Sequence, residues 1–201
     1  MRTRDDDLNK TRSATILSAA GDCFVRNGFH STSMKDICSA AGMSPGTLYH
    51  YFRSKADIIA GIVEGERAAT QLILSRLTDA PDFMQALFMA LEALAGSITE
   101  RDLILHAEVS AEVLRRPELR VRARAADDEA RDWLAAAIAE AQASGELARV
   151  LSAHEAAVCV LALIDGMLWR ATLHEASDLG ERLEPLKQAL TRLLAEGQVP
   201  R

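Results

Sequence analysis

The sequence is poor in aromatic residues and cysteines. Phe, Trp and Tyr account for 4% of its 201 residues, and alanine and leucine dominate from residue 83 onward, a composition that favours helices over sheets. The three cysteines form no C-x-x-C pair, so we expect neither a disulfide framework nor a zinc site. These shortages predict an all-α protein.

Long apolar runs and targeting signals are also absent. The longest apolar run, residues 156–164, falls far short of the roughly 20 residues that span a bilayer. The N-terminal segment MRTRDDDLNK is too acidic and polar for a signal peptide. We therefore expect a cytoplasmic protein without a membrane partner, in which residues 1–10 form a flexible arm.

The chain has a formal net charge of −6, which at first argues against nucleic acid as a partner. Its charges are unevenly distributed, however. Residues 1–55 contain eight basic and five acidic side chains, whereas the remaining residues contain fifteen basic and twenty-four acidic ones. The N-terminal part is therefore the part that we expect to face an anion.

The stretch SMKDICSAAGMSPGTLYHYFRSK, residues 33–55, contains signals for two short helices separated by a turn. Ser33, with a carboxylate three residues later, is a capping box that begins the first helix. Gly42 suits the turn, and Ser44 followed by Pro45 begins the second helix. Two short helices around such a turn are typical of the helix-turn-helix, whose second helix lies in the DNA major groove.

Apolar periodicity, capping boxes and prolines predict further helices on both sides of this motif. One helix precedes it over residues 11–27, with Ile16, Ala20 and Phe24 on one stripe. A long helix follows it from residue 55 to about residue 77. Five more are expected over residues 82–99, 101–116, 118–143, 153–174 and 182–196.

The segment SMKDICSAAGMSPGTLYHYFRSKADII closely resembles the signature of TetR-type transcriptional regulators. The resemblance covers about residues 12–60 in sequence and the rest of the chain in architecture. It implies a three-helix DNA-binding domain over residues 11–57, with its helix-turn-helix motif at 33–52. It also implies a helical effector-binding and dimerisation domain over residues 58–201, with about nine helices in all. The expected function is that of a ligand-responsive homodimer, a repressor released from operator DNA by a small-molecule effector.

The resemblance implies DNA contacts from the reading helix and its neighbours, and residue chemistry agrees. Hydroxyls, backbone N–H groups and a lysine ammonium suit phosphates, and small apolar groups suit thymine methyls. The reading helix contains no Arg or Lys, so preference for an operator would depend on apolar contacts, water and DNA shape. The candidate DNA-binding residues are Thr32, Ser33, Ser44, Pro45, Gly46, Thr47, Tyr49, His50 and Lys55.

Each of these residues also has a purely structural interpretation. Ser44 can serve as a helix cap alone, and a lone His50 is more often an ordinary surface histidine than a ligand. Tyr51 and Phe52, which follow it, are expected in the core. The combination of these residues at this spacing is specific to the motif, although no single residue is.

The effector site is expected among bulky or polar residues that interrupt apolar helix faces. Such a lining, rich in methionine and poor in aromatics, would suit an apolar or amphipathic effector. Ordinary core packing is the alternative for each residue. The candidates are Phe83, Phe88, Met89, His106, Trp133, Met167 and Trp169.

The last two predicted helices carry more apolar surface than one monomer needs to cover. In TetR-type proteins the corresponding helices of two subunits pack as a four-helix interface. An operator with twofold symmetry is also matched by a dimer with twofold symmetry. The alternative is that these residues complete the core of their own chain. The candidate interface residues are Val158, Leu161, Ala162, Asp165, Gly166, Trp169, Leu186, Leu190 and Leu193.

The sequence disfavours two other classes of function. An enzyme on a helical scaffold is disfavoured because the sequence contains no H-E-x-x-H, E-x-x-H, G-x-S-x-G or G-x-x-x-x-G-K motif. No catalytic residue, metal ligand or cofactor is therefore expected. A helical adaptor that sequesters a protein partner would leave the capped, glycine-turned reading helix without a purpose.

Overall fold

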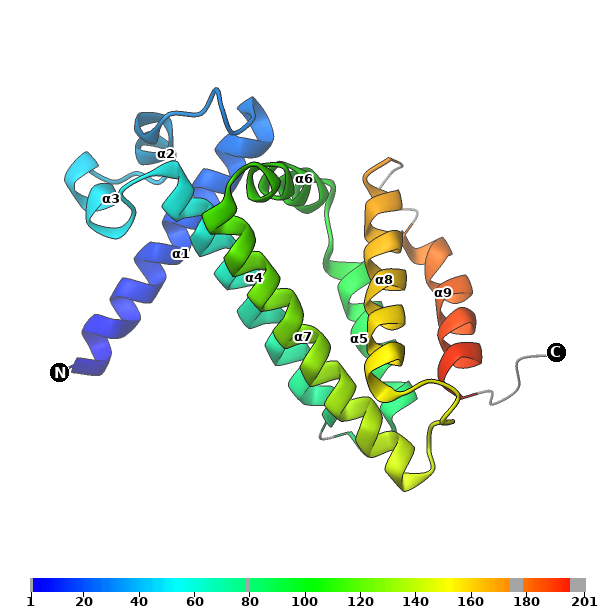
Figure 1. The fold of residues 1–201 in the computed structure, drawn as a ribbon. Coiled ribbons are helices and arrows are strands. Elements are labelled where there is room, and N and C mark those ends of the chain that lie inside the picture. The colour runs from blue at the N-terminus through cyan, green and yellow to red at the C-terminus, as the bar shows by residue number, and fades with distance from the viewer. Residues whose placement is uncertain (1, 79, 174–178, 196–201) are drawn as a thin grey trace. The chain divides into compact units, whose positions relative to one another are not determined.

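The computed structural model describes residues 2–78, 80–173 and 179–195. These residues form nine helices and no strand (Figure 1), which confirms the predicted all-α class. None of the described helices is long and apolar enough to cross a membrane. The helices are α1 (Arg2–Asn27), α2 (Met34–Ala40), α3 (Pro45–Tyr51), α4 (Lys55–Thr78), α5 (Phe83–Ser97), α6 (Glu100–Arg115), α7 (Pro117–Ser144), α8 (Ala153–Ala171) and α9 (Leu179–Leu194).

The helix boundaries lie close to the predicted ones except at the N-terminus. Helix α1 begins at Arg2, before the predicted start at residue 11, and the flexibility of residues 1–10 stays a prediction. No glycine or proline precedes Gly21, so the sequence contains no residue that would end the helix on this side. The Tyr51 hydroxyl also donates a 2.8 Å hydrogen bond to Asn9 Oδ1, which ties the extension to the end of α3.

The chain divides into two compact units. The first, here called the N-terminal unit, comprises Met1–Gly65 and Ile104–Ala123; the second, the C-terminal unit, comprises Glu66–Leu103 and Arg124–Arg201. Most of α6 and the start of α7 therefore belong with α1, α2 and α3. Nothing in the spacing of the sequence signals this assignment.

A single apolar core holds the N-terminal unit together. The predicted stripe on α1 is fully buried, and each of the short helices contributes a buried residue to the same cluster. Helix α6 contributes Val109 and α7 contributes Leu119. The core includes Ile16, Ala20 and Phe24 of α1, Ile37 of α2, Leu48 of α3, and Ile58 and Ile59 of α4.

Helix α4 approaches the motif closely at Gly61. A Cβ atom at this position would lie 2.9 Å from Leu17 Cδ2 and 3.0 Å from Phe52 Cε1. Both distances are shorter than a normal van der Waals contact, so only glycine lets α4 come this near to α1 and to the end of α3. The orientation of α3 therefore depends on this crossing.

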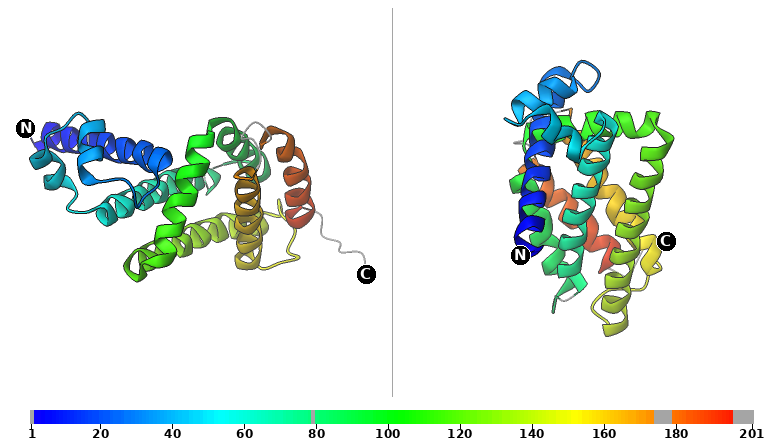
Figure 2. Two further views of the ribbon diagram at one scale, coloured as in Figure 1. Left: turned by 90° about the horizontal axis from the view of Figure 1, so that it is seen from above. Right: turned by 90° about the vertical axis from the view of Figure 1, so that its left-hand side faces the viewer.

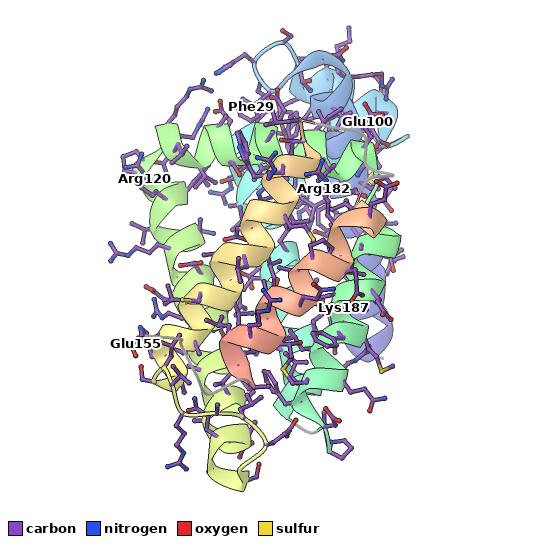
Figure 3. All side chains as sticks on the ribbon, turned by 90° about the vertical axis from the view of Figure 1, so that its right-hand side faces the viewer. Phe29, Glu100, Arg120, Glu155, Arg182 and Lys187 are labelled. Carbon is purple, nitrogen blue, oxygen red and sulfur yellow. The ribbon has the colours of Figure 1, made fainter. Side chains whose placement is uncertain are left out.

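The C-terminal unit has its own core, built from α5, α7, α8 and α9 together with the last turns of α4. Helix α9 packs against both α5 and α8, and Figures 2 and 3 show α8 and α9 side by side. Lys187, labelled in Figure 3, joins α9 to α5 through an ion pair with Glu92, and its ammonium lies 5.5 Å from the Phe88 ring centroid. This unit is a helical bundle in which every helix buries one face.

Candidate nucleic-acid interface

The first helix of the motif, α2, begins with the predicted capping box. The Asp36 N–H donates to Ser33 Oγ at 3.2 Å, and Asp36 Oδ2 accepts from the Ser33 N–H at 2.8 Å and from its hydroxyl at 2.6 Å. These hydrogen bonds, that of the Ser33 side chain first, lower the pKa of Asp36. Ser33 is exposed, but its backbone N–H and hydroxyl already have an acceptor, which a phosphate would have to replace.

Gly42 makes the turn between the two helices. Its φ of 64° is in the left-handed region that favours glycine. The Gly42 N–H donates to Ser39 O at 3.2 Å, and the Met43 N–H donates to Cys38 O at 3.1 Å, which satisfies the last carbonyls of α2. The turn is therefore closed by backbone hydrogen bonds and directs the chain into α3.

The second helix, α3, is capped and anchored as predicted. Ser44 Oγ accepts from the Thr47 N–H at 3.2 Å, and Pro45 occupies the first turn. Leu48 is fully buried and Phe52 is 9% exposed, so both fix the inner side of α3 in the core.

The opposite edge of α3 faces away from the protein. Pro45, Gly46, Tyr49 and His50 are exposed, Tyr49 by 51%, and Thr47 is partly exposed. A Cβ at Gly46 would meet only Ser44 Oγ, at 4.0 Å, so the helix surface is open there to a close neighbour. This edge contains no Lys or Arg, is small at its N-terminal end and bears a hydroxyl at Tyr49, which suits contact with a DNA groove.

Thr32 is the one predicted DNA contact whose side chain is buried. It is 1% exposed, and its hydroxyl donates to Cys23 O at 3.1 Å and to Gly28 O at 2.9 Å. In the free protein the Thr32 hydroxyl is thus bonded within its own chain, and its predicted contact with a phosphate stays a prediction. The hydroxyl joins Cys23, near the end of α1, to Gly28 beyond that helix and so stabilises the turn that joins α1 to α2.

Lys55 is partly buried at the start of α4. Its ammonium donates to the carbonyl oxygens of Phe29 and His30 and lies 4.4 Å from the Phe29 ring centroid. Burial lowers the pKa of Lys55, and Glu112 opposes that shift while Arg116 adds to it. In the free protein, Lys55 thus holds the α1–α2 turn, and its predicted contact with a phosphate stays a prediction.

Two exposed cations beside the motif were not singled out in the sequence. Lys35 lies in the first turn of α2, and Arg53 follows α3 directly. Both are exposed, so a phosphate backbone that approached the motif would attract them. Their positions, on the first helix of the motif and just after the reading helix, were the signal that could have identified them.

Two family descriptions match the chain. Residues 16–62 match bacterial regulatory proteins of the tetR family, and residues 84–195 match the C-terminal part of BetI-type transcriptional repressors. The chain belongs to the TetR family of transcriptional regulators. Regulators of this family bind operator DNA and small-molecule effectors and act as dimers.

Individual relatives agree with this assignment. The HTH-type transcriptional regulator UidR of Escherichia coli strain K12 is 31% identical over 159 residues, which cover 76% of this chain and 78% of UidR. Salmonella enterica GusR is 30% identical, with a TM-score of 0.75 over 91% of this chain and 95% of GusR. FadR from Bacillus subtilis, solved in complex with stearoyl-CoA, is 21% identical and shares the fold, with a TM-score of 0.73 over 92% of this chain and 99% of FadR.

The residues expected to bind the effector of this TetR-family chain are dispersed. Phe83 and Met167 are buried in the core of the C-terminal unit, and Phe88 packs against that core. Met89, Trp133 and Trp169 are exposed by 62%, 38% and 61%, and exposed His106 belongs to the N-terminal unit. Core packing is thus the observed role of Phe83 and Met167, and an effector site among the others stays a prediction.

The residues expected at the dimer interface divide between exposed and buried positions. On α9, Leu186 and Leu190 are buried in the core of their own chain and Leu193 packs against it, so their observed contacts are with that core and their place in a dimer interface stays a prediction. The reason is that α9 fills the space between α5 and α8 with its apolar face. On α8, Leu161 is half-buried, whereas an exposed row comprises Val158, Ala162, Asp165, Gly166 and Trp169.

Proposed function

We propose that this TetR-family chain is a ligand-responsive transcriptional repressor, which binds its operator as a homodimer and leaves it when a small-molecule effector binds. The observation that carries the proposal is that α3 packs against the core on one side and is exposed on the other. Leu48 and Phe52 hold one side in the core, while Gly46 and Tyr49 stand on an open edge. A rigid helix with a free edge is what major-groove readout requires.

The chemistry of this edge supports a particular kind of DNA recognition. Helix α3 contains no Arg or Lys, so a bidentate contact to guanine from within it is unavailable. Pro45 and the Thr47 methyl group suit thymine methyls, and the Tyr49 hydroxyl suits a phosphate. Lys35 and Arg53 add phosphate contacts on either side, which give affinity without sequence information.

Operator binding can be measured by fluorescence anisotropy with a duplex taken from upstream of the gene itself. We expect this duplex to bind about 10³-fold or more tightly than a random duplex, with affinity that falls as salt rises. Thr47→Ala should weaken operator binding about 10- to 100-fold, the value of one base contact. Thr70→Ala on α4, which removes the same atoms from a partly exposed threonine of the C-terminal unit, is the matched control.

Two outcomes would contradict operator recognition. One is equal affinity of the wild-type protein for the upstream duplex and for random DNA. The other is an equal loss of affinity in the Thr47 and Thr70 variants, which would show that the edge of α3 has no special part in binding.

Release by an effector is the second part of the proposal. DNA binding requires a spacing of about 34–36 Å between the two reading helices, which matches one DNA turn. A ligand that binds preferentially to a dimer with a different spacing shifts the population away from the DNA-binding state. The acyl-CoA bound by the B. subtilis FadR supports a panel that includes long-chain acyl-CoA thioesters beside other apolar and amphipathic compounds. Compounds that raise Tm should also weaken operator binding; compounds that raise Tm and leave operator affinity unchanged would contradict release.

A further inference from the structure

A buried carboxylate on α6 is the feature that the proposed reading helix does not explain. Glu112 is 2% exposed and is among the largest fully buried side chains. Its Oε1 lies 3.1 Å from His30 Nε2 and 3.1 Å from an Arg115 guanidinium nitrogen, and its Oε2 lies 3.1 Å from Arg116 Nε. A buried charge is costly unless it is paired, and a leucine in its place would pack without that cost. Its directional contacts therefore need a reason other than stability.

Two partners of this carboxylate, His30 and Arg116, lie at the turn between α1 and α2. One helical turn before Glu112, Glu108 Oε2 accepts a 2.9 Å hydrogen bond from the Phe29 N–H. Phe29 is 2% exposed and lies beside α6, as Figure 3 shows. The Arg116 guanidinium stands 5.2 Å from the Phe29 ring centroid, on which the Lys55 ammonium also rests. The two carboxylates of α6 thus hold this turn through its backbone and through His30.

The same turn controls two elements that face DNA in the proposed function. It leads directly into α2, and its carbonyl oxygens at Phe29 and His30 hold the Lys55 ammonium. A shift of the turn would therefore move α2 and change the position of the Lys55 ammonium at the start of α4. Neither carboxylate is on the motif, so neither is expected to touch DNA.

We infer that Glu108 and Glu112 are positioning residues for operator binding, which fix the α1–α2 turn from α6 and thereby fix α2 and Lys55. This inference rests on the proposed function, because it assigns the carboxylates a role in DNA recognition. Coulombic repulsion predicts the opposite effect from positioning. Removal of a negative charge from a DNA-binding unit should strengthen binding if charge alone mattered, whereas loss of positioning weakens it.

The test compares Glu108→Gln and Glu112→Gln with Glu118→Gln. Each change removes one negative charge from the N-terminal unit, and Glu118 is exposed on α7. We expect both α6 variants to bind the operator about tenfold more weakly, the loss equivalent to one base contact. Their binding to random DNA should stay equal to or tighter than that of the wild type. Glu118→Gln should bind operator as well as the wild type does.

Hydrogen exchange in the free protein supplies a readout that needs no DNA. Exchange of the Phe29 amide should accelerate in Glu108→Gln, because a neutral amide oxygen accepts a weaker hydrogen bond than a carboxylate does, and should remain slow in Glu118→Gln. Far-UV circular dichroism identifies a variant that has failed to fold. If Glu112→Gln does not fold, Glu108→Gln still tests the inference, because Glu108 is only partly buried.

The outcomes separate this inference from the proposed function. If the wild-type protein shows no preference for its operator, the proposed function is overturned and the DNA-positioning role falls with it. If the wild type prefers its operator and the folded α6 variants bind it as tightly as Glu118→Gln does, the inference alone is overturned. Weaker operator binding with faster Phe29 exchange supports it.

Discussion

Burial changes the interpretation of the Thr32 hydroxyl. The hydroxyl that resembled a phosphate ligand in the sequence bonds two carbonyl oxygens of its own chain. Thr32→Val, which keeps the shape and removes the donor, should lower the free energy of unfolding by about 1–3 kcal/mol, because it leaves buried carbonyls with fewer donors. Urea unfolding measures this difference. Thr70→Val, at a partly exposed threonine, should change stability by less than about 0.5 kcal/mol.

Ser33 and Asp36 allow a prediction about pH at the same scale. Hydrogen bonds from Ser33 lower the pKa of Asp36 in the folded protein. A group with a depressed pKa contributes stability above its unfolded pKa, and the contribution disappears as the pH falls through the folded value. Ser33→Ala should therefore raise the pKa of Asp36 toward its ordinary value, as NMR titration of the carboxyl would show. Ser152→Ala, which disrupts the equivalent box of α8, should leave Asp36 unchanged.

The Tm of Ser33→Ala should respond in the corresponding way. The variant should be less stable than the wild type near neutral pH. The difference should narrow as the pH falls from about 4 through the lowered pKa of folded Asp36, below which the aspartate is protonated in both folded and unfolded states. A Tm difference that stays constant down to acid pH would show that the capping box does not depend on the carboxylate.

At the scale of elements, the crossing of α4 over α1 and α3 depends on Gly61. Gly61→Ala should lower the free energy of unfolding by about 1–3 kcal/mol, because its Cβ would overlap Leu17 and Phe52. Gly65→Ala on the same helix meets no atom within 4 Å and should be neutral or stabilising by up to about 1 kcal/mol. Thermal unfolding compares the pair. Equal stability of the two variants would mean that Leu17 and Phe52 move aside freely.

The helices themselves could be predicted from the sequence because their signals are local. Capping boxes at Ser33 and Ser152, the glycine turn at Gly42 and the proline after Ser44 depend on residues a few positions apart, and each is present in the structure. The start of α1 was placed too late because its support comes from Tyr51, far along the chain.

The contacts of α6 and α9 could not be predicted, for the same physical reason. Amphipathic periodicity shows that a helix has an apolar face, but it does not say which neighbour covers that face. The α9 leucines therefore suited a partner subunit as well as their own core, and their contacts within the chain come from the packing of α9 against α5 and α8. Likewise, Glu108 and Glu112 resemble ordinary surface carboxylates until the α1–α2 turn is placed against them.

At the scale of the whole molecule, the net charge of −6 obscures a basic excess in residues 1–55. DNA binding by such a chain requires local rather than overall attraction, so affinity should depend steeply on salt. Arg53→Gln and Lys35→Gln should each reduce the slope of log affinity against log salt by about 1, as expected for one lost phosphate contact. Arg192→Gln, an exposed change on α9, should leave the slope unchanged. Equal slopes in all four proteins would remove Lys35 and Arg53 from the interface.

Gly166 on α8 allows a test of which surface forms the expected dimer interface. With the α9 leucines buried in their own chain, the candidate surface is the exposed row on α8 that includes Val158, Ala162 and Trp169. A Cβ at Gly166 meets no atom within 4 Å in the chain itself, so a larger side chain leaves the fold of the subunit intact. If a second copy packs there, the same side chain prevents the close approach of the two α8 helices.

Gly166→Leu should therefore be folded by circular dichroism and yet shift from dimer to monomer in sedimentation velocity. Gly96→Leu is the matched control, because Gly96 is exposed on α5 and also has nothing within 4 Å. The monomeric variant should lose operator affinity as well, since one helix-turn-helix reads only half of a twofold site. A Gly166→Leu protein that stays dimeric would exclude this face of α8 from the interface and would require the exposed apolar residues of another helix, such as Leu72 on α4, to form it.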